Sequence, residues 1–88
     1  MKLGITGNTG KPGLWKPVAD LISFLKESSY PFVLHPELGL GLSHEGFEIE
    51  SESVARDLTD FLNQSDIVIS FGGDGTLLNT VYELGEHP

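Results

Sequence analysis

A single carboxylate stands among glycines at residues 72–76, in the sequence GGDGT, directly after the apolar run IVISF. Glycines lack a Cβ atom, so the backbone can turn sharply there and approach a ligand closely. Their N–H groups can form an anion-binding nest, which the positive end of a following helix would reinforce. Polyphosphate is the class of ligand that fits such a nest, which would consist of Gly72, Gly73, Gly75 and Thr76.

Asp74 needs a separate explanation, because a carboxylate repels phosphate. It could bind Mg²⁺, or it could accept a hydrogen bond from a hydroxyl group that is about to be phosphorylated. The structural alternative is an N-cap of the following helix. The reciprocal form of that cap is excluded, because Leu77 stands where Glu or Gln would be needed. The pattern therefore indicates phosphoryl transfer, with Asp74 as the catalytic candidate.

Other glycine-rich motifs and metal sites are missing from the sequence. The segment GNTGKPG at residues 7–13 lacks the first glycine and the Ser or Thr of a P-loop, and Leu78 stands where the dinucleotide fingerprint requires a third glycine. The three histidines lie far apart without metal-ligand spacing, so we predict no metal ligands. Asn8 is a further candidate for contact with a ligand, and a solvated turn is the alternative for this residue.

Hydrophobic periodicity predicts the elements that position these residues. Apolar runs bounded by turn residues predict strands at residues 2–6, 32–34 and 66–71. Apolar residues recurring every three to four positions predict helices at residues 17–27, at 54–64 with Ser53 as N-cap, and at about 76–84. Residues 37–52 have no clear period, and we predict a loop there.

The element order β-α-β-α-β-α favours a parallel sheet with right-handed crossovers. The third strand is apolar on both faces, which is typical of a strand covered on both sides. Both faces are covered if the first strand lies between the other two, with one helix on each face. We therefore predict a doubly wound, three-layer α-β-α fold with strand order 2-1-3. The switch point between strands one and three would bring the two glycine-rich loops together.

Length and composition restrict the functional class further. The 88 residues suffice for one small domain, and they contain no cysteine and no run long enough for a membrane span or a signal peptide. The formal net charge is −8, without a basic cluster. Nucleic acid and anionic membranes are therefore not expected as partners. We expect a cytoplasmic location.

The segment DIVISFGGDGTLL resembles the NAD kinases, which phosphorylate the 2′-hydroxyl of NAD to make NADP. The opening KLGITGNTGKP is similar to the family's first strand and its GN-containing loop. The resemblance implies that Asp74 is the catalytic proton acceptor and that Asp74 and Gly75 lie in the NAD site. Many members carry a basic residue where this chain has Asn79, which is a further candidate contact.

The resemblance also implies cofactors, partners and a larger architecture. Mg²⁺ with ATP or polyphosphate would supply the phosphoryl group, and NAD would be the acceptor. Members of the family are far longer and have a second, β-rich domain. Residues 1–88 are therefore expected to be the N-terminal domain of a two-domain enzyme that forms a homo-oligomer at full length and is inactive without the second domain.

Two alternatives follow from the same residues. Diacylglycerol and sphingosine kinases also have GGDGT, but they typically follow it with a small or polar residue and Glu, where this chain has Leu77 and Leu78. Their N-terminal Asn-Pro is also absent, because Thr9 follows Asn8. The alternative from another class is a non-catalytic, nucleotide-binding regulatory domain with the same core.

Overall fold

The computed structural model describes residues 1–10, 12–71 and 80–83. The strands of this part of the chain are β1 (Leu3–Gly7), β2 (Phe32–Leu34), β3 (Ile67–Phe71) and β4 (Thr80–Glu83). Its α-helices are α1 (Trp15–Glu27), α2 (Pro36–His44) and α3 (Leu58–Gln64), and its short 3-10 helices are η1 (Pro12–Leu14) and η2 (Ser51–Ser53). No helix in these ranges is long and apolar enough to cross a membrane.

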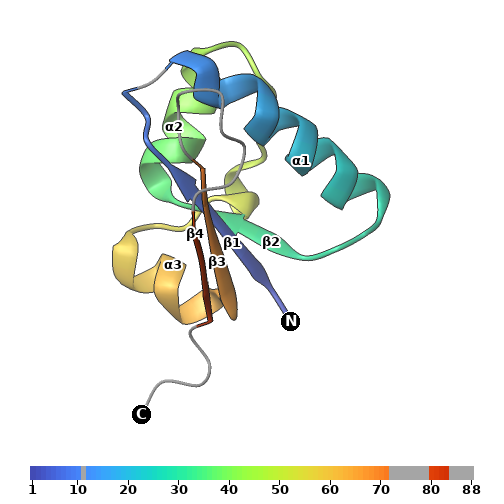
Figure 1. Ribbon diagram of the computed structural model, residues 1–88, viewed down its shortest axis with the longest axis vertical. Helices are drawn as coiled ribbons and strands as arrows, with labels where there is room; N and C mark the ends of the chain where they lie inside the picture. The colour runs from blue at the N-terminus through green and yellow to red at the C-terminus, as the bar shows by residue number, and fades with distance from the viewer. Residues whose placement is uncertain (11, 72–79, 84–88) are drawn as a thin grey trace.

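The strands form one sheet in the order β2-β1-β3-β4 (Figure 1). β1 is parallel to both of its neighbours, with Leu3 opposite Phe32 in β2 and opposite Ile67 in β3. The predicted order 2-1-3 and the α/β class are therefore confirmed. The predicted strand boundaries differ from the observed ones by one residue in β1 and β3 and match them in β2.

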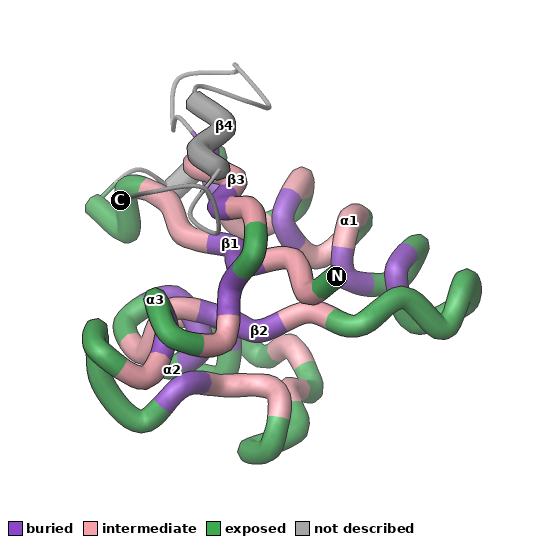
Figure 2. Tube along the Cα trace, turned by 90° about the horizontal axis from the view of Figure 1, so that it is seen from below, coloured by how far each residue is buried: buried purple, intermediate pink, exposed green. Residues whose placement is uncertain are grey.

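Helices cover both faces of the sheet, as predicted, and Figure 1 shows α1 and α3 on opposite sides of the strands. The larger buried cluster joins α1 and α2 to the strands and contains Ile5, Leu14, Val18, Ile22, Leu25, Leu34, Leu38, Leu42 and Phe71. The smaller cluster, on the side of α3, contains Val33, Ala55, Phe61 and Val68. Figure 2 shows these buried segments along the strands and the inner sides of the helices.

The helix α2 is a correction, because the sequence predicts a loop over residues 37–52. Pro36 is the first residue of this helix, and the His35 side chain accepts a hydrogen bond from the Glu37 N–H. Leu38 and Leu42, four residues apart, are buried on its inner side. The period is obscured because glycines replace apolar residues at two positions of the helix. Packing, rather than helix propensity, determines the conformation here.

Those two glycines allow α2 to lie close to its neighbours. A Cβ atom on Gly39 would lie 2.6 Å from Val54 Cγ2, and one on Gly41 would overlap the ring of Trp15. Gly39 is buried and Gly41 is partly buried. The close approach of α2 to its neighbours thus requires glycine at these two positions, although glycine there weakens the helical pattern in the sequence.

The predicted helix at residues 54–64 is correct only in its second half. Val54 and the residue after it are extended, and the carbonyl of Leu34 accepts a hydrogen bond from the Ala55 N–H at 2.9 Å. The N-cap of α3 is Asp57, whose Oδ1 accepts from the Asp60 N–H at 2.8 Å. The predicted cap Ser53 is therefore wrong. Val54 fits the apolar spacing of a helix by coincidence. Its apolar side chain packs against Gly39 of α2.

The predicted third helix is also wrong over residues 80–83, where the chain forms β4 antiparallel to β3. Thr80, Val81 and Tyr82 are β-branched or aromatic residues, which favour strands. The rest of the predicted helix, at residues 76–79 and 84, lies outside the described residues. α1 begins at Trp15, two residues before the predicted start at Pro17.

Candidate functional site

Most of the predicted site lies outside the residues that the structure describes. These predicted residues are Gly72, Gly73, Asp74, Gly75, Thr76 and Asn79. Asn8 lies within the described residues, and so does the strand that leads into the glycine-rich segment. The geometry of the site is therefore defined from its two supporting strands.

The carboxyl ends of β1 and β3 lie side by side. Gly7 of β1 is opposite Phe71 of β3, and the Asn8 N–H donates to the carbonyl of Phe71 at 3.3 Å. This bond extends the pairing of the two strands by one residue. It joins the first loop to the residue immediately before Gly72. The predicted meeting of the two glycine-rich segments at the carboxyl edge is thus supported on both strands up to Phe71.

The first loop is held in shape by the side chain of Asn8. Its Oδ1 accepts a hydrogen bond from the Gly10 N–H at 3.0 Å, which is the pattern of an Asx turn. Asn8, Thr9 and Gly10 are all exposed. The alternative of a solvated turn therefore describes the observed geometry, while the exposed side-chain amide remains available to a ligand at this edge.

Gly7 is a point of close approach between the end of β1 and η1. A Cβ atom there would lie 2.7 Å from Leu14 Cδ1 and 3.3 Å from Phe71 Cβ. Leu14 is completely buried. Because residue 7 is glycine, the Leu14 side chain can pack into the core directly beneath the carboxyl edge of the sheet.

A depression of about 550 Å³ lies beside the first loop. It is lined by residues from the loop, from the start of α1 and from α2, namely Thr9, Trp15, Glu37, Leu40, Gly41, His44 and Glu45. The two carboxylates disfavour a phosphate group at this position. Trp15 packs against the larger buried cluster and lies against Gly41, but no pattern in the sequence indicated a depression beside it.

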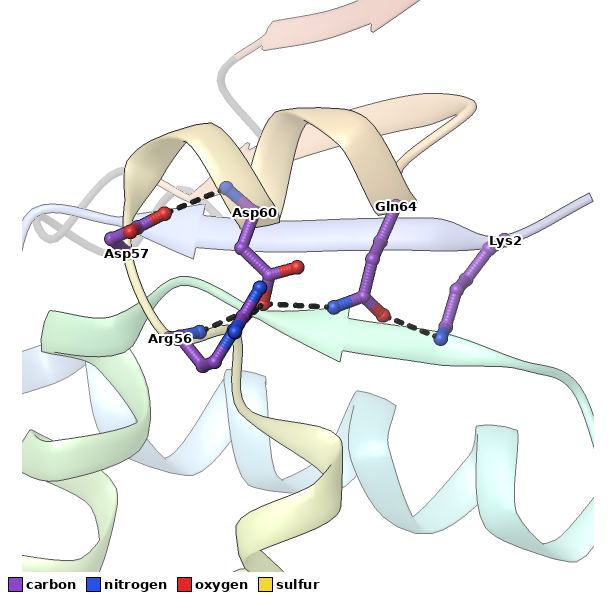
Figure 3. A network of polar contacts seen from close by, with 5 residues as sticks. All are labelled: Lys2, Arg56, Asp57, Asp60 and Gln64. Carbon is purple, nitrogen blue, oxygen red and sulfur yellow. Dashed lines mark hydrogen bonds and ion pairs between the residues drawn. The ribbon is translucent and has the colours of Figure 1, made fainter.

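A polar network runs along α3 from Asp57 to Gln64 and ends at Lys2, next to the start of β1 (Figure 3). The Asp60 Oδ2 accepts from the Arg56 N–H at 2.9 Å and from the Gln64 side chain at 3.0 Å. Gln64 in turn accepts from Lys2 Nζ at 2.7 Å. The backbone hydrogen bond from Arg56, with a smaller contribution from Gln64, lowers the pKa of Asp60. This network ties α3 to the start of β1 and has a structural role.

Metal ligands do not converge in the described part of the chain, where no group of three His, Asp or Glu side chains could hold an ion. His35 and His44 lie at the two ends of α2, and His87 lies outside the described residues. Asp74, which could bind a metal ion, likewise lies outside those residues.

Two curated relatives match the chain over most of its length. One is an NAD kinase from Chloroherpeton thalassium, 36% identical over 78 residues, which are 89% of this chain and 25% of the relative. The other is an NAD kinase from Thiobacillus denitrificans, 32% identical over 85 residues, which are 97% of this chain and 27% of the relative. The chain spans about a quarter of the length of these relatives. No family model and no solved structure matches the chain.

Proposed function

Because this chain belongs to the NAD kinase family, we propose that it forms the part of an NAD kinase that carries the catalytic aspartate. The complete enzyme transfers a phosphoryl group from ATP or polyphosphate to the 2′-hydroxyl of NAD. Residues 1–88 are its N-terminal domain, and the second, β-rich domain corresponds to part of the remaining length of the relatives. The complete enzyme is a cytoplasmic homo-oligomer.

The observation that carries this proposal is the hydrogen bond from the Asn8 N–H to the carbonyl of Phe71. It fixes the first loop beside the residue that precedes the GGDGT segment. In open parallel sheets, ligands bind outside the carboxyl ends of the strands, at the point where the strand order reverses. Here that point lies between β1 and β3. A nucleotide would bind across this edge.

The proposed reaction uses Asp74 as the group that orients the acceptor. The ribose 2′-oxygen attacks the terminal phosphorus of the donor, the bond from that phosphorus to its bridging oxygen breaks, and Asp74 takes the hydroxyl proton. With ATP the products are NADP and ADP. The loose transition state of phosphoryl transfer requires little basicity, so Asp74 contributes mainly by positioning the hydroxyl. Gly72, Gly73, Gly75 and Thr76 would supply N–H groups to phosphate oxygens, and Asn79 a side-chain amide.

The described residues do not form a binding site for Mg²⁺. We assign the metal to the phosphates of the donor, because Mg²⁺ commonly enters kinase sites with substrate phosphates while keeping several of its waters. No step of the proposed reaction depends on a protein ligand to the metal. Neither the lipid kinase nor the non-catalytic domain is favoured, since both relatives carry the name NAD kinase.

The test is a chimera in which residues 1–88 replace the matching part of the Chloroherpeton thalassium relative. We expect it to form NADP from NAD with Mg²⁺ and either ATP or polyphosphate, and we expect Asp74→Asn to reduce the rate by at least about a hundredfold. The matched control is Asp20→Asn, because the Asp20 side chain on α1 is 65% exposed and forms an exposed ion pair with Lys16. NADP would be measured by a coupled dehydrogenase assay.

Two results would contradict the proposal. Turnover unchanged by Asp74→Asn in a folded chimera would remove this residue from the mechanism. Robust NADP formation by the 88 residues alone would show that the site is complete within them. Phosphoryl transfer requires acceptor and donor to be held in line, and one wall of the site does not provide this. We therefore expect no NADP from the isolated chain.

A further inference from the structure

His35 lies at the carboxyl edge of the sheet and contacts β1, α2 and α3. Its N–H donates to the carbonyl of Ile5 in β1 at 2.9 Å, and its carbonyl accepts from the Gly39 N–H in α2 at 2.9 Å. Its ring meets the ring of Phe61 in α3 edge-on, with the centroids 5.4 Å apart. The side chain is partly buried.

The imidazole also caps α2. Its Nδ1 accepts a hydrogen bond from the Glu37 N–H at 3.1 Å. A backbone N–H can only donate, so Nδ1 must carry a lone pair and the proton must be on Nε2. The capping residues that are common in proteins are Ser, Thr, Asp and Asn, which accept at any pH near neutrality. Histidine accepts through Nδ1 only while the ring is neutral.

From this geometry we propose that His35 is a pH-dependent cap that releases the first turn of α2 when it is protonated. The imidazolium has N–H groups at both ring nitrogens, so it cannot accept from Glu37. Its positive charge would also face the positive end of the helix dipole. Histidine is the side chain that changes charge between pH 5 and 8. The cap is therefore present while the ring is neutral and is lost when the ring is protonated.

Carboxylates of the described residues lie on the elements that pack against His35. On α2, Glu37 is two residues from His35 in the sequence, and its side chain is exposed. Two further carboxylates belong to α3 and its N-cap, close to Phe61 in the sequence. Asp57 accepts a hydrogen bond from the Asp60 N–H, and Asp60 accepts one from the Arg56 N–H. In the described part of the chain, the ion pairs within 4.0 Å join Lys16 to Asp20, Lys26 to Glu50 and Arg56 to Asp60, so none involves His35.

Release of α2 would reach the carboxyl edge through a direct contact. Gly41 of α2 lies against the ring of Trp15, and Trp15 and Thr9 line the depression beside the first loop. If the loosening extends from the first turn to Gly41, Trp15 loses part of its support. This inference concerns the conformation of the chain and does not depend on the kinase activity.

The test compares the wild-type chain with His35→Asn, which caps at every pH. As the pH falls from 7.5 to 5.5, the folding equilibrium constant of the wild type should decrease about fivefold relative to that of His35→Asn, as expected for one lost cap. The Glu37 amide resonance should move with the same midpoint as the His35 ring in the wild type and should stay constant in the variant. His44→Asn, at the other end of α2, is the matched control and should titrate like the wild type.

An equal pH response in His35→Asn and in the wild type would overturn the proposal. If the variant does not fold, the wild-type resonances decide alone. A Glu37 amide that titrates with the His35 ring supports the cap, and one that is insensitive to the protonation of that ring refutes it.

Discussion

At the scale of single residues, Asp60 shows how an exposed helix start is stabilised by one carboxylate. The Arg56 backbone N–H and the Gln64 side chain both donate to it, and its pKa is lowered. A lowered pKa means that the ionised form stabilises the folded state at pH values above about 3.9, the ordinary value of Asp. This stabilisation is lost as the pH falls through the lower folded-state pKa.

We therefore expect Asp60→Asn to unfold at a lower temperature than the wild type at pH 7, because the amide oxygen of Asn accepts these two hydrogen bonds more weakly than a carboxylate does. The difference should shrink as the pH is lowered below 4. Thermal melts followed by circular dichroism at several pH values would measure it. Asp20→Asn is the control and should change little, because the Lys16–Asp20 pair is exposed. A difference that persists below the folded-state pKa would contradict this account.

At Asn8, one part of the geometry of the candidate site could be predicted from the sequence and another part could not. The glycine-rich surroundings indicated that it would lie in a turn at the end of the first strand, and it does. Its hydrogen bond to the N–H two residues later follows from local chemistry. Its backbone bond to Phe71 depends on the register between strands 60 residues apart, which no local pattern contains. For the same reason the depression beside Trp15 was not predictable.

At the scale of elements, α3 begins where a side chain can cap it rather than where the apolar spacing begins. Asp57→Ala should destabilise the chain by about 1 kcal/mol, because the Asp60 N–H loses its acceptor. Ser53→Ala removes the cap that the sequence favoured, and it should have an effect near zero. Urea unfolding of the two variants would measure the difference. Equal effects of the two substitutions would show that Asp57 is not the cap.

The close packing of α2 makes a second prediction. In a helix interior, Gly→Ala is favourable by about 1 kcal/mol, but overpacking costs about 1–3 kcal/mol. A Cβ on Gly39 would lie 2.6 and 2.8 Å from the two methyl groups of Val54, so Gly39→Ala should destabilise the chain. The same substitution in a Val54→Ala background should be neutral or stabilising. Leu40→Ala is the control, since Leu40 is 74% exposed.

The elements that the sequence predicts well are those whose pattern and packing agree. The strands are short, mainly apolar segments between turn residues, and α1 has a complete apolar side. The pattern fails in α2, where close approach replaces apolar residues by Gly39 and Gly41. It fails again before α3, because Val54 fits the helical spacing but packs against Gly39 of α2 and lies outside α3. Both errors occur where tertiary packing overrides the local pattern.

At the scale of the whole molecule, β4 covers one edge of the parallel strands. It pairs with β3 along residues 67–70. An exposed edge is a site for pairing with another chain. A chain truncated after Phe71 should therefore sediment as larger species at micromolar concentration than residues 1–88 do. Identical sedimentation of the two chains would show that β4 does not protect the edge.

The two buried clusters are unequal, and this has a consequence for how the molecule comes apart. Among the residues whose burial the structure describes, the cluster under α1 and α2 has nine members, whereas the one under α3 has four. Small proteins open in cooperative units, and units with few buried contacts open with the least free energy. The seven-residue helix α3, with Leu58 56% and Leu62 43% exposed, should therefore detach before the rest of the domain unfolds. In native-state hydrogen exchange, its amides should lose protection at denaturant concentrations that leave those of α1 protected, and simultaneous loss would show that the domain unfolds as one unit.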